Sequence, residues 1–292
     1  MILEGKKDIK RLAIYFFYDK DGIVDDYIPY MLEELNKNTS ELLIVCNGKL
    51  TPEGRNKLEK YTSNILVREN KGFDVWAYKE GLELYGWDRL ETFDEVILMN
   101  FTIMGPLYPL KEMFNEMDTR DLDFWGITVH HSAPFDPFGT IKYNYLPLHI
   151  QSHFITVRNT MLRSIEFKKY WDEIPMINRY EEAVGFHEAI FTKTFEDKGY
   201  KWDTYVDTSD LYKHSYGPII MSPLELIKNR KCPIIKRRSF FHNYNDFINY
   251  NTGEATIEVF EYIKNNLNYD VNLIWDNILR VQNQSDIKKC LH

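Results

Sequence analysis

The chain has 292 residues, of which 44% are hydrophobic, so it can bury a sizeable core as one large domain or two modest ones. Its formal net charge of −8 argues against nucleic acid as the main partner, because neutralising phosphates requires a basic face. Three scattered cysteines, Cys46, Cys232 and Cys290, match neither a metal-ligand spacing nor a disulfide framework and favour a reducing cytoplasm. No apolar run reaches the ~18–20 residues that cross a bilayer, and the first residues do not resemble a signal peptide.

The first hundred residues alternate between apolar runs and segments of helical spacing. The predicted strands are residues 11–18, 41–46, 64–68 and 95–99. The predicted helices between them are residues 27–36, 52–61 and 74–85. This order predicts parallel strands joined by right-handed crossovers, as in half of a Rossmann fold.

The pattern is less regular after residue 109. Strands are expected at residues 123–128 and 149–157, on either side of a long loop at 130–147. Helices are expected at 110–117, 158–171, 181–198, 254–266 and 271–281, and residues 212–250 are expected to be irregular. Without a clear linker or repeat, the chain is expected to form one globular α/β unit with a helical tail.

The most informative stretch is the end of the strand at residues 95–99, where an apolar run gives way to Asn100-Phe101-Thr102 and then Gly-Pro. Ligands bind at the carboxyl ends of strands in open α/β sheets, so Asn100 and Thr102 are candidate site residues. Carboxylates are the ligands that Mg²⁺ and Mn²⁺ prefer, whereas these neutral side chains suit a diphosphate or a sugar hydroxyl. The alternative is a strand-end turn whose polar groups are satisfied locally.

A second candidate follows the strand at residues 64–68, where an Asn70-x-Gly72 turn leads into a helix. The free N–H groups and partial positive charge of a helix N-terminus suit phosphate or ribose oxygens. Asp74 lies in the first turn of this helix, where it either takes part in a site or only caps the helix.

A third candidate is the segment around residues 148–154. On a strand, alternate side chains share a face, so His149, Gln151 and His153 are expected to point one way and Ser152 the other. Three polar residues on one face invite a ligand. Two histidines four residues apart on a strand lie about 13 Å from each other, too far to share one metal ion.

Glu188 lies on a predicted helix among apolar neighbours. Partial burial would raise its pKa and make it a general base. Glu181 and Glu182, one to two turns earlier, are rival bases, and a plain solvated glutamate is the alternative.

The basic run Lys236-Arg237-Arg238 precedes residues 240–242, which are Phe, Phe and His. Three cations beside aromatic rings suit a diphosphate or an anionic lipid head group. A solvated charge run is the alternative.

Together these motifs resemble the rhamnan synthesis F family of bacterial glycosyltransferases across nearly the whole chain. Several family motifs occur in the family's order. The matching residues are Ala13–Phe16; Arg68, Asn70, Gly72, Phe73 and Asp74; Asn100, Thr102, Gly105 and Pro106; Phe124–Thr128; His149, Gln151, Ser152 and Phe154; Glu188, Thr192 and Gly199; and Asn268–Trp275.

The resemblance implies a GT-A-like α/β fold with a Rossmann-type, mostly parallel sheet flanked by helices. The expected glycosyltransferase domain spans residues 1–250, with a nucleotide-binding half at 1–110 and an acceptor half at 111–250, before a helical C-terminal extension at 251–292. Relatives often continue beyond the segment matched by residues 287–292, so the chain is either one domain of a longer plan or a naturally short member.

The resemblance also implies an activity, for which we hypothesise an inverting reaction. A sugar, with rhamnose the leading candidate, would pass from a nucleotide-sugar donor to a growing surface polysaccharide on a lipid carrier at the cytoplasmic face of the membrane. The general base would be Glu188, and His149 or His242 would help the basic run to stabilise the leaving diphosphate. The expected donor-binding residues are Tyr18, Asn47, Arg68, Asn70, Gly72, Asp74, Asn100, Thr102, Gln151, Lys236, Arg237 and Arg238.

One departure concerns Phe101, because relatives usually have Asp between the Asn and the Ser/Thr of this motif. We therefore expect no required cofactor, with Mg²⁺ or Mn²⁺ disfavoured. The alternative is a non-catalytic sugar-binding or scaffold domain of the same fold. A nucleotide-dependent oxidoreductase is not supported, because no G-x-G-x-x-G follows the first strand.

Overall fold

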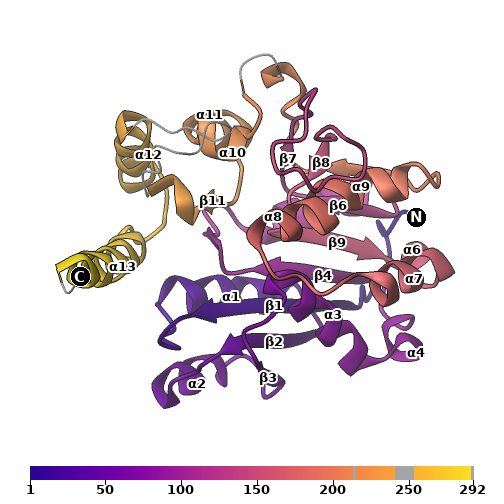
Figure 1. Ribbon diagram of the computed structural model, residues 1–292, viewed down its shortest axis with the longest axis horizontal. Coiled ribbons are helices and arrows are strands. Elements are labelled where there is room, and N and C mark those ends of the chain that lie inside the picture. Colours follow the sequence, from indigo (N-terminus) through magenta and orange to yellow (C-terminus); the bar gives the residue numbers. More distant parts are fainter. Residues whose placement is uncertain (213–214, 241–252, 291–292) are drawn as a thin grey trace.

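A seven-stranded sheet runs through the centre of the computed structural model, which describes residues 1–212, 215–240 and 253–290 (Figure 1). Its strand order is β10-β6-β9-β4-β1-β2-β3. The strands are β1 (Arg11–Asp19), β2 (Glu41–Gly48), β3 (Ile65–Arg68), β4 (Glu95–Asn100), β6 (Phe124–Gly126), β9 (Phe154–Arg158) and β10 (Trp202–Thr204). The first four are mutually parallel, and β9 runs antiparallel between β4 and β6. The predicted Rossmann-type, mostly parallel α/β fold is therefore confirmed.

The apolar sequences of β1 and β4 explain their central position in the sheet. Both β1 and β4 are nearly continuous apolar runs, as expected of strands covered by helices on both faces. The helices of this half are α1 (Tyr27–Lys37), α2 (Pro52–Leu58), α3 (Phe73–Tyr85) and α4 (Trp87–Leu90). Gly81 of α3 lets this helix lie close to the sheet, because a Cβ there would be only 2.8 Å from Ile14. Every strand and helix predicted for this half is present, whereas α4 and the short strand β5 (Ile103–Met104) were not predicted.

The prediction of one strand over residues 149–157 is wrong. The segment divides into β8 (His149–Ile150), which pairs with β7 (Val129–His130) in a separate two-stranded sheet, and β9 in the main sheet. Gly126 permits this arrangement, because a Cβ there would lie 2.1 Å from the side chain of Ile150. The alternation of faces predicted for residues 149–153 therefore does not hold.

The second half is more helical than predicted. Its helices are α5 (Leu110–Asp118), α6 (Asn159–Leu162), α7 (Ile165–Glu173), α8 (Tyr180–Ala183), α9 (Ala189–Glu196), α10 (Pro218–Met221) and α11 (Pro223–Arg230). The last two correct the irregular assignment of residues 212–250, and both begin with proline, a helix-start signal. A π-helical turn, Val184–Glu188, joins α8 to α9, and this helical stretch ends before Gly199 as predicted.

A short strand pair links the basic run to the rest of the molecule. Strand β11 (Ile235–Lys236) pairs antiparallel with β5 (Ile103–Met104), directly after the Asn100–Thr102 turn. The predicted C-terminal helices are α12 (Gly253–Asn266) and α13 (Asn272–Cys290), and they lie beyond β11 in Figure 1. Their buried residues, such as Val259 and Ile274, join the same apolar core as β1 and β4. Among the described helices, none is both long enough and apolar enough to span a membrane.

Candidate functional site

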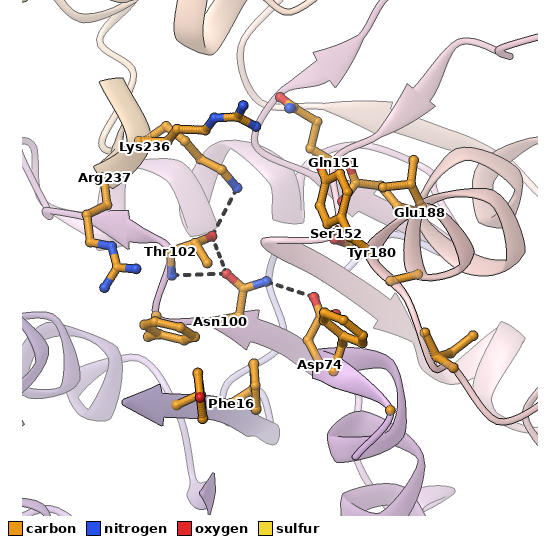
Figure 2. Close-up of a pocket in the computed structure, with 18 of the residues that line it drawn as sticks. Phe16, Asp74, Asn100, Thr102, Gln151, Ser152, Tyr180, Glu188, Lys236 and Arg237 are labelled. Atoms are coloured by element: carbon orange, nitrogen blue, oxygen red, sulfur yellow. Dashed lines mark hydrogen bonds between the residues drawn. The ribbon is translucent and has the colours of Figure 1, made fainter. Parts of the chain in front are cut away.

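A cavity of about 1180 Å³ opens at the carboxyl ends of the parallel strands. Most of the predicted site residues meet there. Those that line it are Tyr18, Asn70, Gly72, Asp74, Asn100, Thr102, His149, Gln151, Glu188, Lys236, Arg237 and Arg238. Figure 2 shows Asn100, Thr102 and Asp74 between Lys236 on one side and Glu188 on the other.

A directed chain of hydrogen bonds crosses the floor of the cavity (Figure 2). Lys236 Nζ donates to Thr102 Oγ1 over 2.9 Å, and that hydroxyl donates to Asn100 Oδ1 over 2.5 Å. Asn100 Nδ2 then donates to Asp74 Oδ2 over 3.0 Å. The polar groups of the strand-end turn are thus satisfied locally, yet the same groups face the cavity and connect a cation to a carboxylate.

Asp74 is not a helix cap. The N-cap of α3 is Gly72, and the Asp74 carboxylate instead accepts the hydrogen bond from Asn100. Burial, followed by the negative charge of Glu188, raises the pKa of Asp74 to about 6. The side chain therefore belongs to the cavity and is affected by the charge of the second carboxylate in it.

The turn before α3 is held from behind by two predicted site residues, Asn47 and Arg68. Arg68 binds both carboxylate oxygens of Glu80, at 2.7 and 2.5 Å, and also donates to Asn47 Oδ1 and to the carbonyl of Lys71. Asn47 Nδ2 donates to the carbonyl of Phe73 over 3.2 Å. Neither side chain lines the cavity, and both shape the turn, so direct binding of a donor by Asn47 and Arg68 stays a prediction.

The pairing of β11 with β5 carries Lys236 into the site. Its ammonium also lies 3.4 Å from His153 Nδ1, and burial together with the Lys236 charge holds the pKa of His153 well below its usual range. His153 is therefore a neutral hydrogen-bond acceptor for this cation. Burial lowers the pKa of Lys236, while the charges of Glu188 and Asp74 oppose that shift.

Phe101, the middle residue of the Asn100–Thr102 turn, is buried in an aromatic cluster. Its ring meets those of Phe16 and Phe17 edge-on, with centroids 5.6 and 6.0 Å away. The guanidinium carbon of Arg237 lies over the Phe101 ring, 4.9 Å from the centroid. A phenyl ring beneath a cation cannot act as a ligand for a divalent metal, so the donor set of this turn does not fit one.

Glu188 is positioned by the π-helical turn, and 26% of its side chain is exposed. Ser152 Oγ donates to one of its oxygens, and His149 Nε2 lies 3.9 Å from the other. Burial raises the pKa of Glu188, but interactions with His149, the charge of Lys236 and the hydrogen bond from Ser152 outweigh burial and lower that pKa. The predicted rise is therefore wrong, because the polar and charged groups around the carboxylate outweigh its burial.

His149 stands between this carboxylate and a second histidine. Its Nδ1 lies 2.7 Å from the carbonyl of Pro147, which can only accept a hydrogen bond, so Nδ1 carries a proton. Nε2 is then left to face Glu188. The ring stacks on that of His130, with centroids 5.3 Å apart, and burial followed by the charge of His149 lowers the pKa of His130 to about 4.

The rival bases do not reach the cavity. Neither Glu181 nor Glu182 lines it, and Glu182 accepts hydrogen bonds from Asn178 N and Arg179 Nε. Ser152 lines the cavity with Gln151, contrary to the predicted alternation. His242 lies outside the described residues.

Several lining residues were not predicted. They are the apolar or aromatic side chains of Phe16, Phe73, Phe138, Leu146, Met176, Ile177 and Tyr180, together with His130. The family motifs quoted above contain Phe16 and Phe73, but no local signal marks the others, because segments distant in sequence bring them to the cavity. Among the described residues, no group of three or more His, Cys, Asp or Glu side chains is arranged to hold a metal ion.

The fold and the cavity define a Rossmann-type α/β protein with a polar ligand site at the carboxyl edge of its sheet. The chain belongs to the rhamnan synthesis protein F family, whose model matches residues 42–291. This confirms the resemblance seen in the sequence.

A curated relative is the uncharacterized protein y4gN of Sinorhizobium fredii (strain NBRC 101917 / NGR234). The two are 25% identical over 213 residues, which cover 73% of this chain and 53% of the relative. The chain therefore spans about half the length of this relative.

Three solved structures illustrate the similarity of fold. The Mn/GDP form of core-mannan synthase A from Aspergillus fumigatus has a TM-score of 0.34 at 8% identity, covering 62% of this chain and 66% of that one. A cytidylyltransferase from Leptospira borgpetersenii has a TM-score of 0.39 at 13% identity, with coverages of 88% and 94%. Glucosyl-3-phosphoglycerate synthase from Mycobacterium tuberculosis, in complex with Mg²⁺ and UDP, has a TM-score of 0.33 at 10% identity, with coverages of 52% and 57%. Similarity at this level assigns no function.

Proposed function

We propose that this chain is an inverting glycosyltransferase that moves a sugar, with rhamnose the leading candidate, from a nucleotide-sugar to a bacterial surface polysaccharide. The observation that carries the proposal is one cavity with a carboxylate, Glu188, facing a cation, Lys236, across the carboxyl edge of a Rossmann-type sheet. Membership of the rhamnan synthesis protein F family supports the sugar and the polysaccharide acceptor. The proposed setting is the cytoplasmic face of the membrane, with the acceptor carried on a lipid.

In the proposed reaction, Glu188 removes the proton from an acceptor hydroxyl. The oxygen attacks the anomeric carbon from the face opposite the diphosphate, the new glycosidic bond forms, and the bond from carbon to the diphosphate breaks. The leaving diphosphate takes the electron pair of that bond, and Lys236, Arg237 and Arg238 stabilise its charge. The proton stays on Glu188 until it passes to water.

The electrostatics of the cavity are consistent with these roles. The lowered pKa of Glu188 keeps the side chain in its proton-accepting form at neutral pH. An anionic diphosphate beside Lys236 would offset the charge of that cation, one of the groups that lower this pKa. Binding of the donor would thus make Glu188 a stronger base when it is needed.

The proposed reaction needs no divalent metal. Where relatives usually place an Asp, this chain has Phe101 with Arg237 above its ring, and the cations at residues 236–238 line the same cavity. Turnover should therefore persist in EDTA, and loss of turnover that Mn²⁺ restores would contradict this assignment.

The missing acidic residue also favours a second candidate, a non-catalytic sugar-binding or scaffold domain. One experiment separates the two: incubation of the purified chain with a panel of nucleotide-sugars, with and without a rhamnose oligosaccharide as acceptor. Transfer or donor hydrolysis that Glu188→Gln abolishes, with nucleoside diphosphate binding intact, supports the enzyme. Full activity of the Glu188→Gln variant would refute the base assignment, and nucleotide-sugar binding without any turnover would favour the second candidate.

A further inference from the structure

The mouth of the cavity is bordered by three exposed apolar side chains: Phe73, Met176 and Tyr180. Their exposed fractions are 39%, 40% and 53%, and all three line the cavity. Single exposed apolar residues are ordinary, but a group of them around a polar cavity marks a binding surface. We propose that this apolar rim binds a neutral sugar ring of the acceptor glycan, an inference that rests on the proposed function.

A hydrogen bond and a ring contact hold the rim residues in place. Trp76 Nε1 of α3 donates to the carbonyl of Pro175 over 2.8 Å, which ties the segment before Met176 to the helix that begins with Phe73. The ring of Tyr180 meets that of Phe138 edge-on at 6.3 Å, so the long loop supports this side chain.

The same loop is locked onto the helical stretch that carries Tyr180 and Glu188. Thr140 Oγ1 donates to the carbonyl of Glu181 over 2.8 Å. A Cβ on Gly185 would lie 2.0 Å from Thr140 Oγ1, so only glycine permits this contact. The rim and the proposed base are therefore held by one packed unit.

Phe73 gives an independent sign of function. Its φ of +56° is a left-handed conformation that bulky side chains rarely adopt, and its ring is exposed rather than part of the core. The bonds from Asn47 and Arg68 hold this turn in place. Strain of this kind persists where the surrounding structure enforces it, and it gathers at ligand sites. The molecule thus maintains a strained aromatic residue at the cavity mouth.

The distribution of charge indicates a neutral sugar rather than a phosphate at the rim. The cations nearest to the rim in sequence, Lys71 and Arg179, pair with Glu69 and Glu182. Tyr180 and Glu188 lie on the same side of the cavity, across from Lys236, as Figure 2 shows. The Glu188 carboxylate would repel a phosphate there, whereas a sugar offers a flat apolar face to the rings and hydroxyls to Glu188. A ring bound at the rim would present its hydroxyl to the base, with the diphosphate on the far side.

The test measures binding without turnover, using the whole chain. Binding of a rhamnose trisaccharide is measured by saturation-transfer NMR. Binding of dTDP and of UDP is measured by calorimetry. The variants are Tyr180→Ala and Phe73→Asn, the second chosen because asparagine tolerates the left-handed conformation. The matched control is Tyr212→Ala, since Tyr212 is 54% exposed but does not line the cavity.

We expect each rim variant to bind the trisaccharide about three- to tenfold more weakly, the range that loss of an aromatic contact implies. The rim variants should bind the nucleoside diphosphates as the wild type does, and the Tyr212→Ala control should bind the trisaccharide as the wild type does. Phe73→Asn should not lower Tm, because it relieves backbone strain.

Failure of the unmodified chain to bind the trisaccharide would overturn the inference, as would rim variants that weaken dTDP or UDP binding instead. The protein could instead bind the trisaccharide through the rim but neither bind nor turn over nucleotide-sugars. That result would refute the proposed function and leave the inference about the rim standing.

Discussion

Replacing Asp74 with Asn should make the protein more stable at neutral pH, although the residue lies at the heart of the candidate site. Its carboxyl pKa is raised from 3.8 to about 6, first by burial and then by the charge of Glu188. The native state therefore holds this proton more tightly than the unfolded chain, and stability falls as pH rises from about 4 to about 6. Such a pKa difference is worth at most about 3 kcal/mol. Because Asp74 is only partly buried, we expect Asp74→Asn to gain about 1–2 kcal/mol at pH 7.

The assay is urea unfolding and, for Tm, thermal unfolding of the two proteins at pH 7 and again at pH 4. The gain should appear at pH 7, as a rise in Tm of roughly 2–8 °C, and largely vanish at pH 4, where the wild-type carboxyl is protonated. Asp88→Asn, on the exposed surface of α4, is the control and should change little at either pH. A loss of stability at pH 7, or the same gain at both pH values, would refute the reasoning.

Three further predictions concern the same cavity. Lys236→Met should weaken binding of dTDP or UDP by about 10- to 150-fold in calorimetry, because one charged hydrogen bond is lost. The control variant Lys228→Met, at an exposed position, should bind both nucleotides as the wild type does. A change of less than twofold in Lys236→Met would contradict the role of Lys236. Glu188→Gln should lower kcat by about 10²–10⁴-fold with donor affinity within about twofold, and an Asp74→Asn variant with the larger loss would identify Asp74 as the base. Glu188→Gln should also be less stable than wild type at pH 7 in urea unfolding. The deficit should be smaller at pH 3, because a lowered carboxyl pKa adds stability that declines once pH falls below the pKa of the unfolded chain; equal loss at both values would contradict that shift.

The sequence predicts the first half of the fold well because its elements are local. Long apolar runs such as β1 and β4 have lengths and ends that neighbouring residues determine. The prediction of one strand at residues 149–157 fails for a reason that the local sequence does not reveal. The apolar residues of this segment suit one strand, but the gap left by Gly126 and the bond from Ile150 N to Thr192 Oγ1 turn β8 into another sheet.

The candidate site likewise contains residues that the sequence can place and residues that it cannot. Asn100, Thr102 and Asp74 follow strands or begin a helix, so topology alone brings them together. The partner of Thr102, Lys236, lies 134 residues away and arrives only through the β5–β11 pair. The basic run could therefore be noticed in the sequence but not placed. Residues such as Arg68 look like ligands because they share a motif with the site, whereas in the structure they shape its turn.

The neutral side chain of Phe101 affects the net charge of the cavity. A divalent ion held by one carboxylate adds a net charge of about +1 to a site. An arginine over a neutral ring adds the same net charge, and Arg237 occupies that position with its guanidinium carbon 4.9 Å from the ring centroid. Arg237 N also donates to the carbonyl of Thr102 over 2.9 Å, so the side chain starts from a fixed point on the same turn. An aspartate at position 101 would pair with Arg237 and reduce the positive charge offered to a diphosphate. Phe101 and the basic run therefore both favour the proposal that this site binds an anionic diphosphate without a metal.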